Sequence, residues 1–377
     1  MIDSPSPIVV VGAGVLGAST ATQLARTGNA VTLITAGDPA DGASGRSLAW
    51  LNSAARSAGP YHRLRLLGIQ RYREFAVDHA DAGIVFGGSL NWAAAGASYR
   101  QRHEQELHAG YPSQWVSADE ATELVPAVDP AAIAAEGAIF NPDDGWVELP
   151  RLISVLLEEF VRLGGSLITG AGRCRVEQTA GRATAVLTGD GRRIAAERIL
   201  LAAGAGTPAL TAELGFDLPE QTPIAALVHA RAAGGQTSLR TVLNTPRVSI
   251  RPTVDGGLVM DAGWSEREIV RLPEGGYRVP DSTIEMLLVE ARTVLAGHPE
   301  LTLLGVGHGP KPIPGDGEPV LGPLPGVDGC HLAFTHSGAT LGLITGELLA
   351  EEVITGTPSP LLADFRPDRF AADPDAD

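Results

Sequence analysis

The order of apolar and polar positions predicts a β-α-β unit at the start of the chain. Residues 8–11 form a short β-branched run, which is typical of a buried parallel strand. Residues 18–26 then follow the pattern of a helix, and Gly28 is typical of a helix end. A second apolar run over residues 30–34 completes the unit, so we expect a parallel sheet covered by helices.

Apolar residues at helical spacing predict three later helices, over residues 61–77, 150–164 and 341–353. Residues 166–201 alternate like strands, and residues 216–309 indicate short strands joined by Gly and Pro turns. The 377 residues are enough for about two domains. The pattern therefore predicts an α/β protein in which a Rossmann-like domain is combined with a second, mixed or antiparallel sheet.

Composition and charge exclude several classes of partner. The chain has 28 basic and 44 acidic residues, and a net charge of −16 repels nucleic acid and anionic membranes. No run of 18 apolar residues is present to span a bilayer, and no basic region precedes the first apolar run as in a signal peptide. Cys174 and Cys330 lie far apart and lack the spacing of metal ligands, which fits a reducing compartment. We expect a soluble, cytoplasmic protein without a metal, nucleic-acid or membrane partner; the oligomeric state stays open.

Three glycines after the first strand predict a dinucleotide site. Gly12 permits the tight turn from strand to helix, Gly14 lets the backbone approach a pyrophosphate, and Gly17 lets helix and strand pack closely. The pyrophosphate would then lie at the helix N-terminus, where free N–H groups and the helix dipole favour an anion. The acidic residue expected after the second strand is replaced by Thr35, with Asp38 close but offset. This residue alone therefore does not distinguish FAD from NAD.

Four further segments, in this order along the chain, carry a family resemblance: Gly42–Ser47, Ala202–Gly206, Asp316–Gly322 and Thr335–Leu341. Together with the glycine motif they resemble the D-amino-acid oxidase superfamily of flavoenzymes, in its glycine oxidase and sarcosine oxidase branch. The likeness extends from residue 8 to residue 370. It implies FAD as the cofactor, with the N-terminus of the last helix at the ribityl chain and pyrimidine end of the flavin, where its dipole stabilises negative charge.

The resemblance and the glycine motif together assign a set of residues to FAD. They are Gly12, Ala13, Gly14, Val15, Leu16, Gly17, Thr35, Ala36, Ser44, Gly45, Arg46, Ser47, Trp50, Arg173, Ala203, Gly204, Ser337, Gly338, Ala339, Thr340 and Leu341. Members that tether FAD do so through a cysteine at the position of Gly309, and Cys330 lies beyond it. We therefore expect non-covalent FAD.

The substrate side departs from the glycine oxidase pattern. Lys311 stands where an arginine is expected, and Ser249 stands where a tyrosine is expected. A lysine cannot form the bidentate fork that arginine makes with a carboxylate. Arg251 is a possible second cation unless strand alternation points it to solvent. Trp50 is a candidate pocket wall or core residue, and His336 a candidate for a place beside the flavin. We expect Lys311 and His336 to act in catalysis, and Lys311, Arg251, Ser249 and Trp50 to bind the substrate.

The resemblance implies two discontinuous domains and a reaction. The FAD domain would comprise residues 1–80, 145–215 and 310–365, the substrate domain residues 81–144 and 216–309, and residues 371–377 a disordered tail. The expected reaction is oxidation of a C–N bond of an amino acid, an N-substituted glycine or another secondary amine, to an imine, with hydride transfer to flavin and H2O2 formation from molecular oxygen. The alternatives are a flavin dehydrogenase with another acceptor, an NAD(P)-dependent oxidoreductase, and a non-catalytic nucleotide-binding protein.

Overall fold

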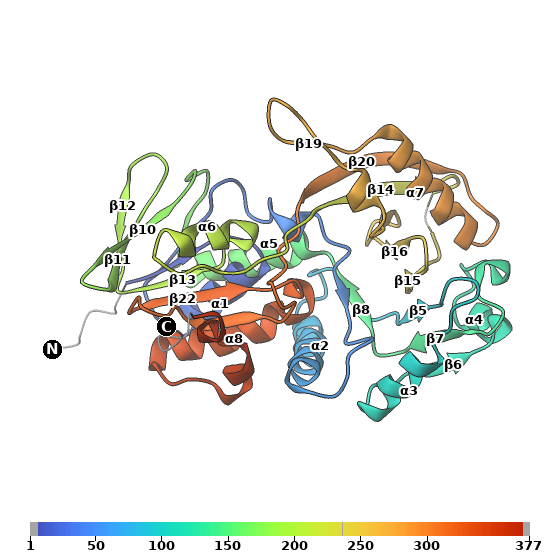
Figure 1. The fold of residues 1–377 in the computed structure, drawn as a ribbon, viewed down its shortest axis with the longest axis horizontal. Helices are drawn as coiled ribbons and strands as arrows, with labels where there is room; N and C mark the ends of the chain where they lie inside the picture. Colours follow the sequence, from blue (N-terminus) through green and yellow to red (C-terminus); the bar gives the residue numbers. More distant parts are fainter. Residues whose placement is uncertain (1–6, 236, 372–377) are drawn as a thin grey trace, which may run out of the picture.

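The computed structural model describes residues 7–235 and 237–371, and two large sheets lie at opposite ends of the elongated molecule (Figure 1). The first sheet has six strands in the order β21 (Val320–Pro323), β22 (Cys330–Phe334), β13 (Arg198–Leu201), β1 (Ile8–Val11), β2 (Val31–Ile34) and β9 (Ser166–Ile168). All neighbours are parallel except β21, which runs antiparallel to β22. The predicted β-α-β unit is its centre.

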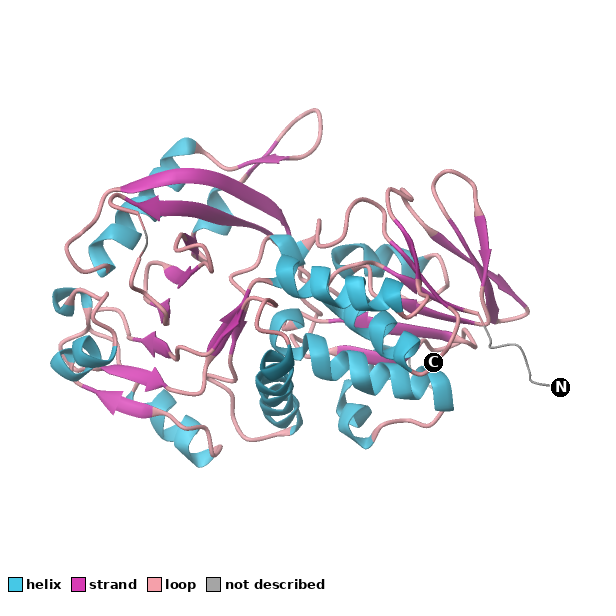
Figure 2. Ribbon diagram, turned by 180° about the vertical axis from the view of Figure 1, so that it is seen from behind, coloured by secondary structure: helices cyan, strands magenta, loops and turns pink. Residues whose placement is uncertain are grey.

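Different layers cover the two faces of this sheet. Helices gather over one face (Figure 2): α1 (Val15–Arg26), α2 (Pro60–Asp78), α5 (Leu149–Arg162) and α8 (Gly338–Thr355). The other face carries a small sheet of β10 (Arg175–Thr179), β11 (Arg182–Leu187) and β12 (Arg193–Ala195), together with α6 (Thr207–Ala212). In β1, Ile8 and Val10 pack toward the helices, and Val9 and Val11 pack toward the small sheet. A strand buried on both faces has to be apolar at every position, which explains this run.

The second large sheet is mixed, as predicted. Its eight strands follow the order β20 (Leu301–Pro310), β14 (Ile224–Ala232), β17 (Leu258–Asp261), β16 (Ser249–Pro252), β15 (Val242–Asn244), β5 (Ser89–Asn91), β7 (Ala138–Asn141) and β6 (Gln114–Val116). Neighbours are antiparallel except β15 and β5. Between the large sheets lie β3 (Trp50–Leu51), β8 (Gly145–Val147) and β4 (Ile84–Val85), and β18 (Val270–Arg271) pairs with β19 (Tyr277–Arg278).

Three helices in the segments that form the second large sheet were not predicted: α3 (Arg100–His108), α4 (Ala118–Leu124) and α7 (Asp281–Val294). The prediction of short strands throughout residues 216–309 is therefore wrong for α7. Its buried residues, Thr283, Leu287, Ala291 and Val294, do follow helical spacing, and they dock this helix on the second sheet. The domain boundaries within these segments stay predictions.

Among the described residues, no helix combines the length and apolar character needed to cross a bilayer. Except for Ala371, the tail expected to be disordered lies outside the described residues.

Candidate active site

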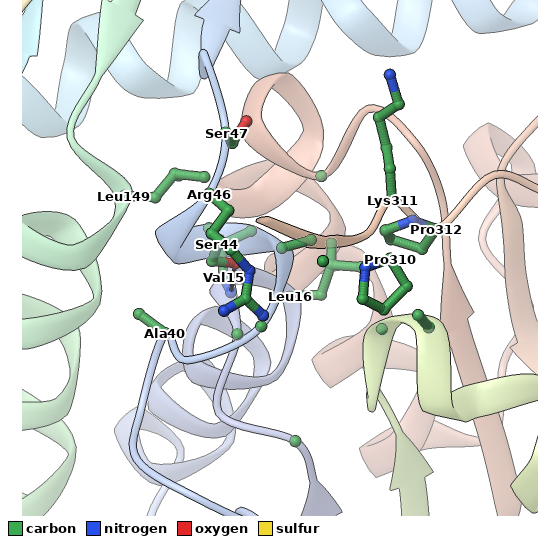
Figure 3. Close-up of a pocket in the computed structure, with 18 of the residues that line it drawn as sticks. Val15, Leu16, Ala40, Ser44, Arg46, Ser47, Leu149, Pro310, Lys311 and Pro312 are labelled. Atoms are coloured by element: carbon green, nitrogen blue, oxygen red, sulfur yellow. Dashed lines mark hydrogen bonds between the residues drawn. The ribbon is translucent and has the colours of Figure 1, made fainter. Parts of the chain in front are cut away.

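A cavity of about 980 Å³ runs from the N-terminus of α1 to the second sheet. Because β1, β13 and β22 are parallel, α1 and α8 both begin at the same edge of the first sheet, and both helix N-termini line the cavity. Figure 3 shows Arg46 in the loop after β2, near the start of α1, and Lys311 extending away from Pro310 and Pro312. The cavity therefore joins the glycine motif to side chains of the second sheet.

The glycine motif forms a backbone cradle at one end of this cavity. Gly12 has a φ of +108°, and a Cβ built on it would lie 2.3 Å from the carbonyl oxygen of Ala202. A Cβ on Gly17 would lie 1.8 Å from the carbonyl oxygen of Gly12. Helix α1 has no side-chain cap at Gly14 and no acidic residue in its first turn. The Val15 N–H donates to Ser44 Oγ at 3.1 Å, and the helix dipole with the remaining N–H groups of the first turn can bind an anion, which fits the pyrophosphate of FAD.

The N-terminus of α8 faces the same cavity and is held by a buried arginine that the sequence analysis missed. Arg65 of α2 is 7% exposed and donates to Ser337 Oγ at 2.6 Å, to the Asn52 carbonyl oxygen at 2.8 Å and to Asn52 Oδ1 at 2.9 Å. Burial lowers the pKa of Arg65, and no carboxylate pairs with it among the described residues. Its charge adds to the positive helix end. The sequence signal for Arg65 was the position of an arginine among the apolar residues on one face of the helix.

Arg46 presents a buried polar atom toward the cofactor end. Its Nε has no hydrogen-bond partner among the described residues, although the atom is buried. The side chain lies against the backbone of β20, because a Cβ on Gly307 would come within 3.0 Å of Arg46 Cγ and a Cβ on Gly309 within 2.9 Å of Arg46 Nε. An orphaned donor beside a glycine cradle fits a bound polar cofactor.

Most of the residues predicted to hold FAD line the cavity. They are Gly12, Ala13, Gly14, Val15, Leu16, Thr35, Ala36, Ser44, Arg46, Ser47, Trp50, Arg173, Ala203, Gly204, Ser337, Gly338, Ala339 and Thr340. Gly17, Gly45 and Leu341 are not part of the lining. A Cβ on Gly17 would meet the backbone of Gly12 in the turn after β1, and the Arg173 guanidinium pairs with Glu213 at the exposed rim.

Polar side chains from several elements meet at the other end of the cavity. Lys311 follows β20, Ser249 and Asp261 lie on β16 and β17, and Asn244 ends β15; all four line the cavity. Lys311 Nζ donates to Glu266 Oε1. Burial raises the pKa of Asp261 to about 6, an effect that nearby Lys311 opposes and Glu266 reinforces. Asp261 was not predicted; the signal for it was a charged residue at the end of an apolar strand.

His336 also lines the cavity, immediately before α8. Its side chain is accessible to solvent, and the surrounding protein lowers its pKa to about 4 by desolvation. The positive charges of Lys311, Arg65 and Arg56 act in the same direction. His336 is therefore a neutral imidazole near neutral pH.

Arg251 points neither to solvent nor into the cavity. It is 5% exposed, is absent from the lining, and donates to the carbonyl oxygens of Leu48 at 2.6 Å and of Pro252 at 2.8 Å. Its guanidinium also lies over the Trp146 ring, 5.2 Å from the centroid. These contacts make Arg251 a brace for the loop after β2, so its placement does not favour the predicted contact with a substrate carboxylate.

Trp50 lines the cavity and is fixed from behind by a buried acid. Trp50 Nε1 donates to Asp144 Oδ2 at 2.9 Å, Ser89 Oγ donates to the same oxygen at 2.7 Å, and the Tyr111 hydroxyl donates to Asp144 Oδ1. Burial raises the pKa of Asp144 to about 7. The indole is thus a wall of the cavity with a fixed orientation. The sequence alone could not show this contact, because it depends on the pairing of β3 with β8.

A Rossmann-like sheet with a glycine cradle, a second helix N-terminus across the same cavity and a mixed sheet beside it define a flavin-dependent oxidoreductase. The family model "FAD dependent oxidoreductase" (DAO) matches residues 7–352, and the chain belongs to this family. Its cofactor is FAD, as the resemblance implied, which sets aside the NAD(P)-dependent and non-catalytic alternatives.

Individual relatives agree with this assignment. The chain is 26% identical over 364 residues to the glycine oxidase of Bacillus licheniformis, covering 93% of each. It is 27% identical over 233 residues to the 4-methylaminobutanoate oxidase of Paenarthrobacter nicotinovorans, covering 60% of this chain and 27% of that one. The structure of glycine oxidase from Geobacillus kaustophilus superposes with a TM-score of 0.84 at 22% identity, covering 97% of this chain and 100% of that one. Iminodiacetate oxidase from Chelativorans sp. BNC1 gives 0.80 at 24% identity, covering 96% and 98%. These structures share the fold.

Proposed function

We propose that the protein oxidises a C–N bond of an amino acid or amine to an imine, with an N-substituted glycine or another secondary amine as its substrate. When bound, FAD supplies the hydride acceptor, and its reoxidation by molecular oxygen yields H2O2. The observation that carries the proposal is the continuity of one cavity, which has the glycine cradle at one end and Lys311, Ser249 and Asp261 at the other.

Lys311 is the proposed anchor for the substrate carboxylate. An ammonium group has three donors, and one of them is used by Glu266, so the others are available to a ligand. Because Lys311 and Ser249 replace the arginine and tyrosine of the glycine oxidase pattern, the carboxylate is held by a point charge without a fork. A looser grip of this kind favours a larger substrate than free glycine. Trp50 and His336 complete the walls as uncharged groups.

The backbone cradle and the N-terminus of α8 are the proposed FAD contacts, and the flavin is held without a covalent bond. Cys330 is 1% exposed and absent from the lining, and burial raises the pKa of its thiol to about 12. A cysteine at Gly309 would meet Arg46. Acid precipitation is therefore expected to leave all of the flavin in the supernatant; flavin that stays with the pellet contradicts this proposal.

A panel of amines under anaerobic conditions tests the function. The panel contains glycine, D-alanine, L-proline, N-methylglycine and N-ethylglycine, and the readout is the loss of flavin absorbance. We expect the N-alkyl glycines to reduce the flavin fastest, and Lys311→Met to weaken their binding by about tenfold or more while flavin content is unchanged. Admission of air with a peroxidase-coupled assay measures H2O2. Reduction by glycine or D-alanine alone, with inert N-alkyl glycines, would refute the proposed substrate class.

A further inference from the structure

A row of polar residues crosses four strands of the second sheet at one level. Asn91 of β5 pairs in register with Asn244 of β15, Asn244 with Ser249 of β16, and Ser249 with Asp261 of β17. Directly opposed residues on neighbouring strands project from the same face of a sheet. Asn244, Ser249 and Asp261 also line the cavity. The row therefore delivers a connected set of polar groups to the substrate end.

The direction of the hydrogen bonds along this row is set from its far end by Arg102. A guanidinium can only donate, and Arg102 Nη2 lies 3.3 Å from Asn91 Oδ1, so Asn91 presents its oxygen there. Asn244 Nδ2 must then donate to the same oxygen, at 3.0 Å. The Asn244 amide consequently turns Oδ1 toward Ser249, whose hydroxyl donates to it at 3.0 Å.

A second contact fixes the Asn91 amide independently. Asn91 Nδ2 donates to Ser89 Oγ at 2.9 Å, and the only hydrogen of that hydroxyl is donated to Asp144 Oδ2 at 2.7 Å. Both neighbours therefore require the same orientation of Asn91. Since Ser249 gives its single hydrogen to Asn244, its oxygen presents only lone pairs to the cavity.

Asp261 stands directly opposite Ser249 and is a second acceptor. Its carboxylate makes no hydrogen bond or ion pair with the part of the chain that the structure describes, because Lys311 pairs with Glu266 instead. The Asp261 oxygens are not enclosed by the protein, so a donor on a ligand in the cavity can reach them. The cavity thus has two adjacent acceptors, one of them anionic, next to the cation of Lys311.

We propose that Ser249 and Asp261 together bind the protonated amine of the substrate as it enters, and that one N–H proton then passes to the Asp261 carboxylate, because only the neutral amine has the lone pair that lets hydride leave. This assignment rests on the proposed function and adds to it the group that recognises the nitrogen. A secondary ammonium has two N–H donors, which matches two acceptors, and the neighbouring Lys311 meets the carboxylate of the same zwitterion. The role of Ser249 is therefore to accept from the amine, and the row that ends at Arg102 keeps its oxygen in the accepting orientation.

A pair of ligands isolates this contact. N-Methylglycine carries the ammonium, whereas (methylthio)acetate has the same carboxylate and a sulfur without N–H donors or charge. The dissociation constant of N-methylglycine comes from the saturation of anaerobic flavin reduction, and that of (methylthio)acetate from its perturbation of the flavin spectrum. We expect Asp261→Asn to weaken N-methylglycine by about tenfold to a hundredfold and to leave (methylthio)acetate bound as tightly or more tightly. Ser249→Ala should weaken only N-methylglycine, by about fivefold.

The control is Asp255→Asn, which removes an exposed carboxylate from the turn of the same β16–β17 hairpin and outside the cavity. It should change neither dissociation constant. Equal weakening of both ligands by Asp261→Asn, or no weakening of N-methylglycine, overturns the assignment while the proposed function stands. A wild-type flavin that none of the panel amines reduces refutes the proposed function itself and the assignment with it. If Asp261→Asn loses its flavin, the Ser249→Ala variant decides instead. Weaker binding of N-methylglycine with unchanged binding of (methylthio)acetate supports the assignment, and equal changes in the two dissociation constants overturn it.

Discussion

The two ends of the cavity are built in different ways. The cofactor end is built around helix N-termini and a glycine turn whose residues are contiguous in sequence, from Gly12 to Gly17, where an added Cβ would collide with a carbonyl oxygen. The substrate end uses side chains from separate strands, and Asn91 and Asp261 are 170 positions apart in the numbering. The first end depends on the absence of side chains, and the second depends on strand register. This difference makes the first rigid to substitution and the second open to change.

The sharpest way to break the cofactor end is Gly12→Ala. The new Cβ would lie 2.3 Å from the Ala202 carbonyl oxygen at a φ of +108°. We expect the purified variant to contain almost no flavin, because the turn that aims α1 at the pyrophosphate cannot form. The ratio of flavin to protein absorbance measures this loss.

Gly28→Ala is the matched control within the same β-α-β unit. Gly28 also has a positive φ, of +79°, but nothing lies within 4 Å of its added Cβ. This variant should lose about 1 kcal/mol of stability and keep its flavin. Equal flavin loss in both variants would show that backbone strain alone, rather than the collision, governs this end.

The contrast also explains how much could be predicted from the sequence. The β-α-β unit and a dinucleotide site followed from glycines that have one physical reason each, so local spacing was enough for them, whereas FAD and most of its predicted contacts followed from the family resemblance. Asp261 and Arg65 were missed because their importance arises from strand pairing and helix packing between distant segments. For Arg251 the sequence left two placements open, substrate contact or solvent, because strand alternation does not reveal that the loop after β2 covers this side chain.

A smaller effect should come from Asp144→Asn, which loosens the wall between the two ends. Asp144 accepts from Trp50, Ser89 and Tyr111, and an asparagine offers one accepting oxygen and turns an NH2 group toward a donor. We expect KM for the amine to rise about tenfold with flavin content and kcat little changed. Steady-state kinetics measures the split. The neighbouring Asp143→Asn, which removes a surface pair with Arg73, serves as the control and should leave KM unaltered.

The smallest expected effect is on the pH dependence of the affinity for N-methylglycine. A decrease in affinity at low pH, called the acid limb, distinguishes Asp261 from His336. The pKa of Asp261 is raised to about 6, chiefly by burial, with Lys311 opposing and Glu266 reinforcing the shift. The acceptor for the amine is therefore ionised above pH 6, and affinity for N-methylglycine should fall as the pH drops through that value. His336 has a pKa lowered to about 4, so it stays neutral over this range and contributes no limb. Dissociation constants between pH 5 and pH 8 should show the limb in wild type and in His336→Gln, and not in Asp261→Asn. A limb that disappears in His336→Gln would move the titrating group from the strand row to the N-terminus of α8, and the substrate end would then depend on the same helix terminus as the cofactor end.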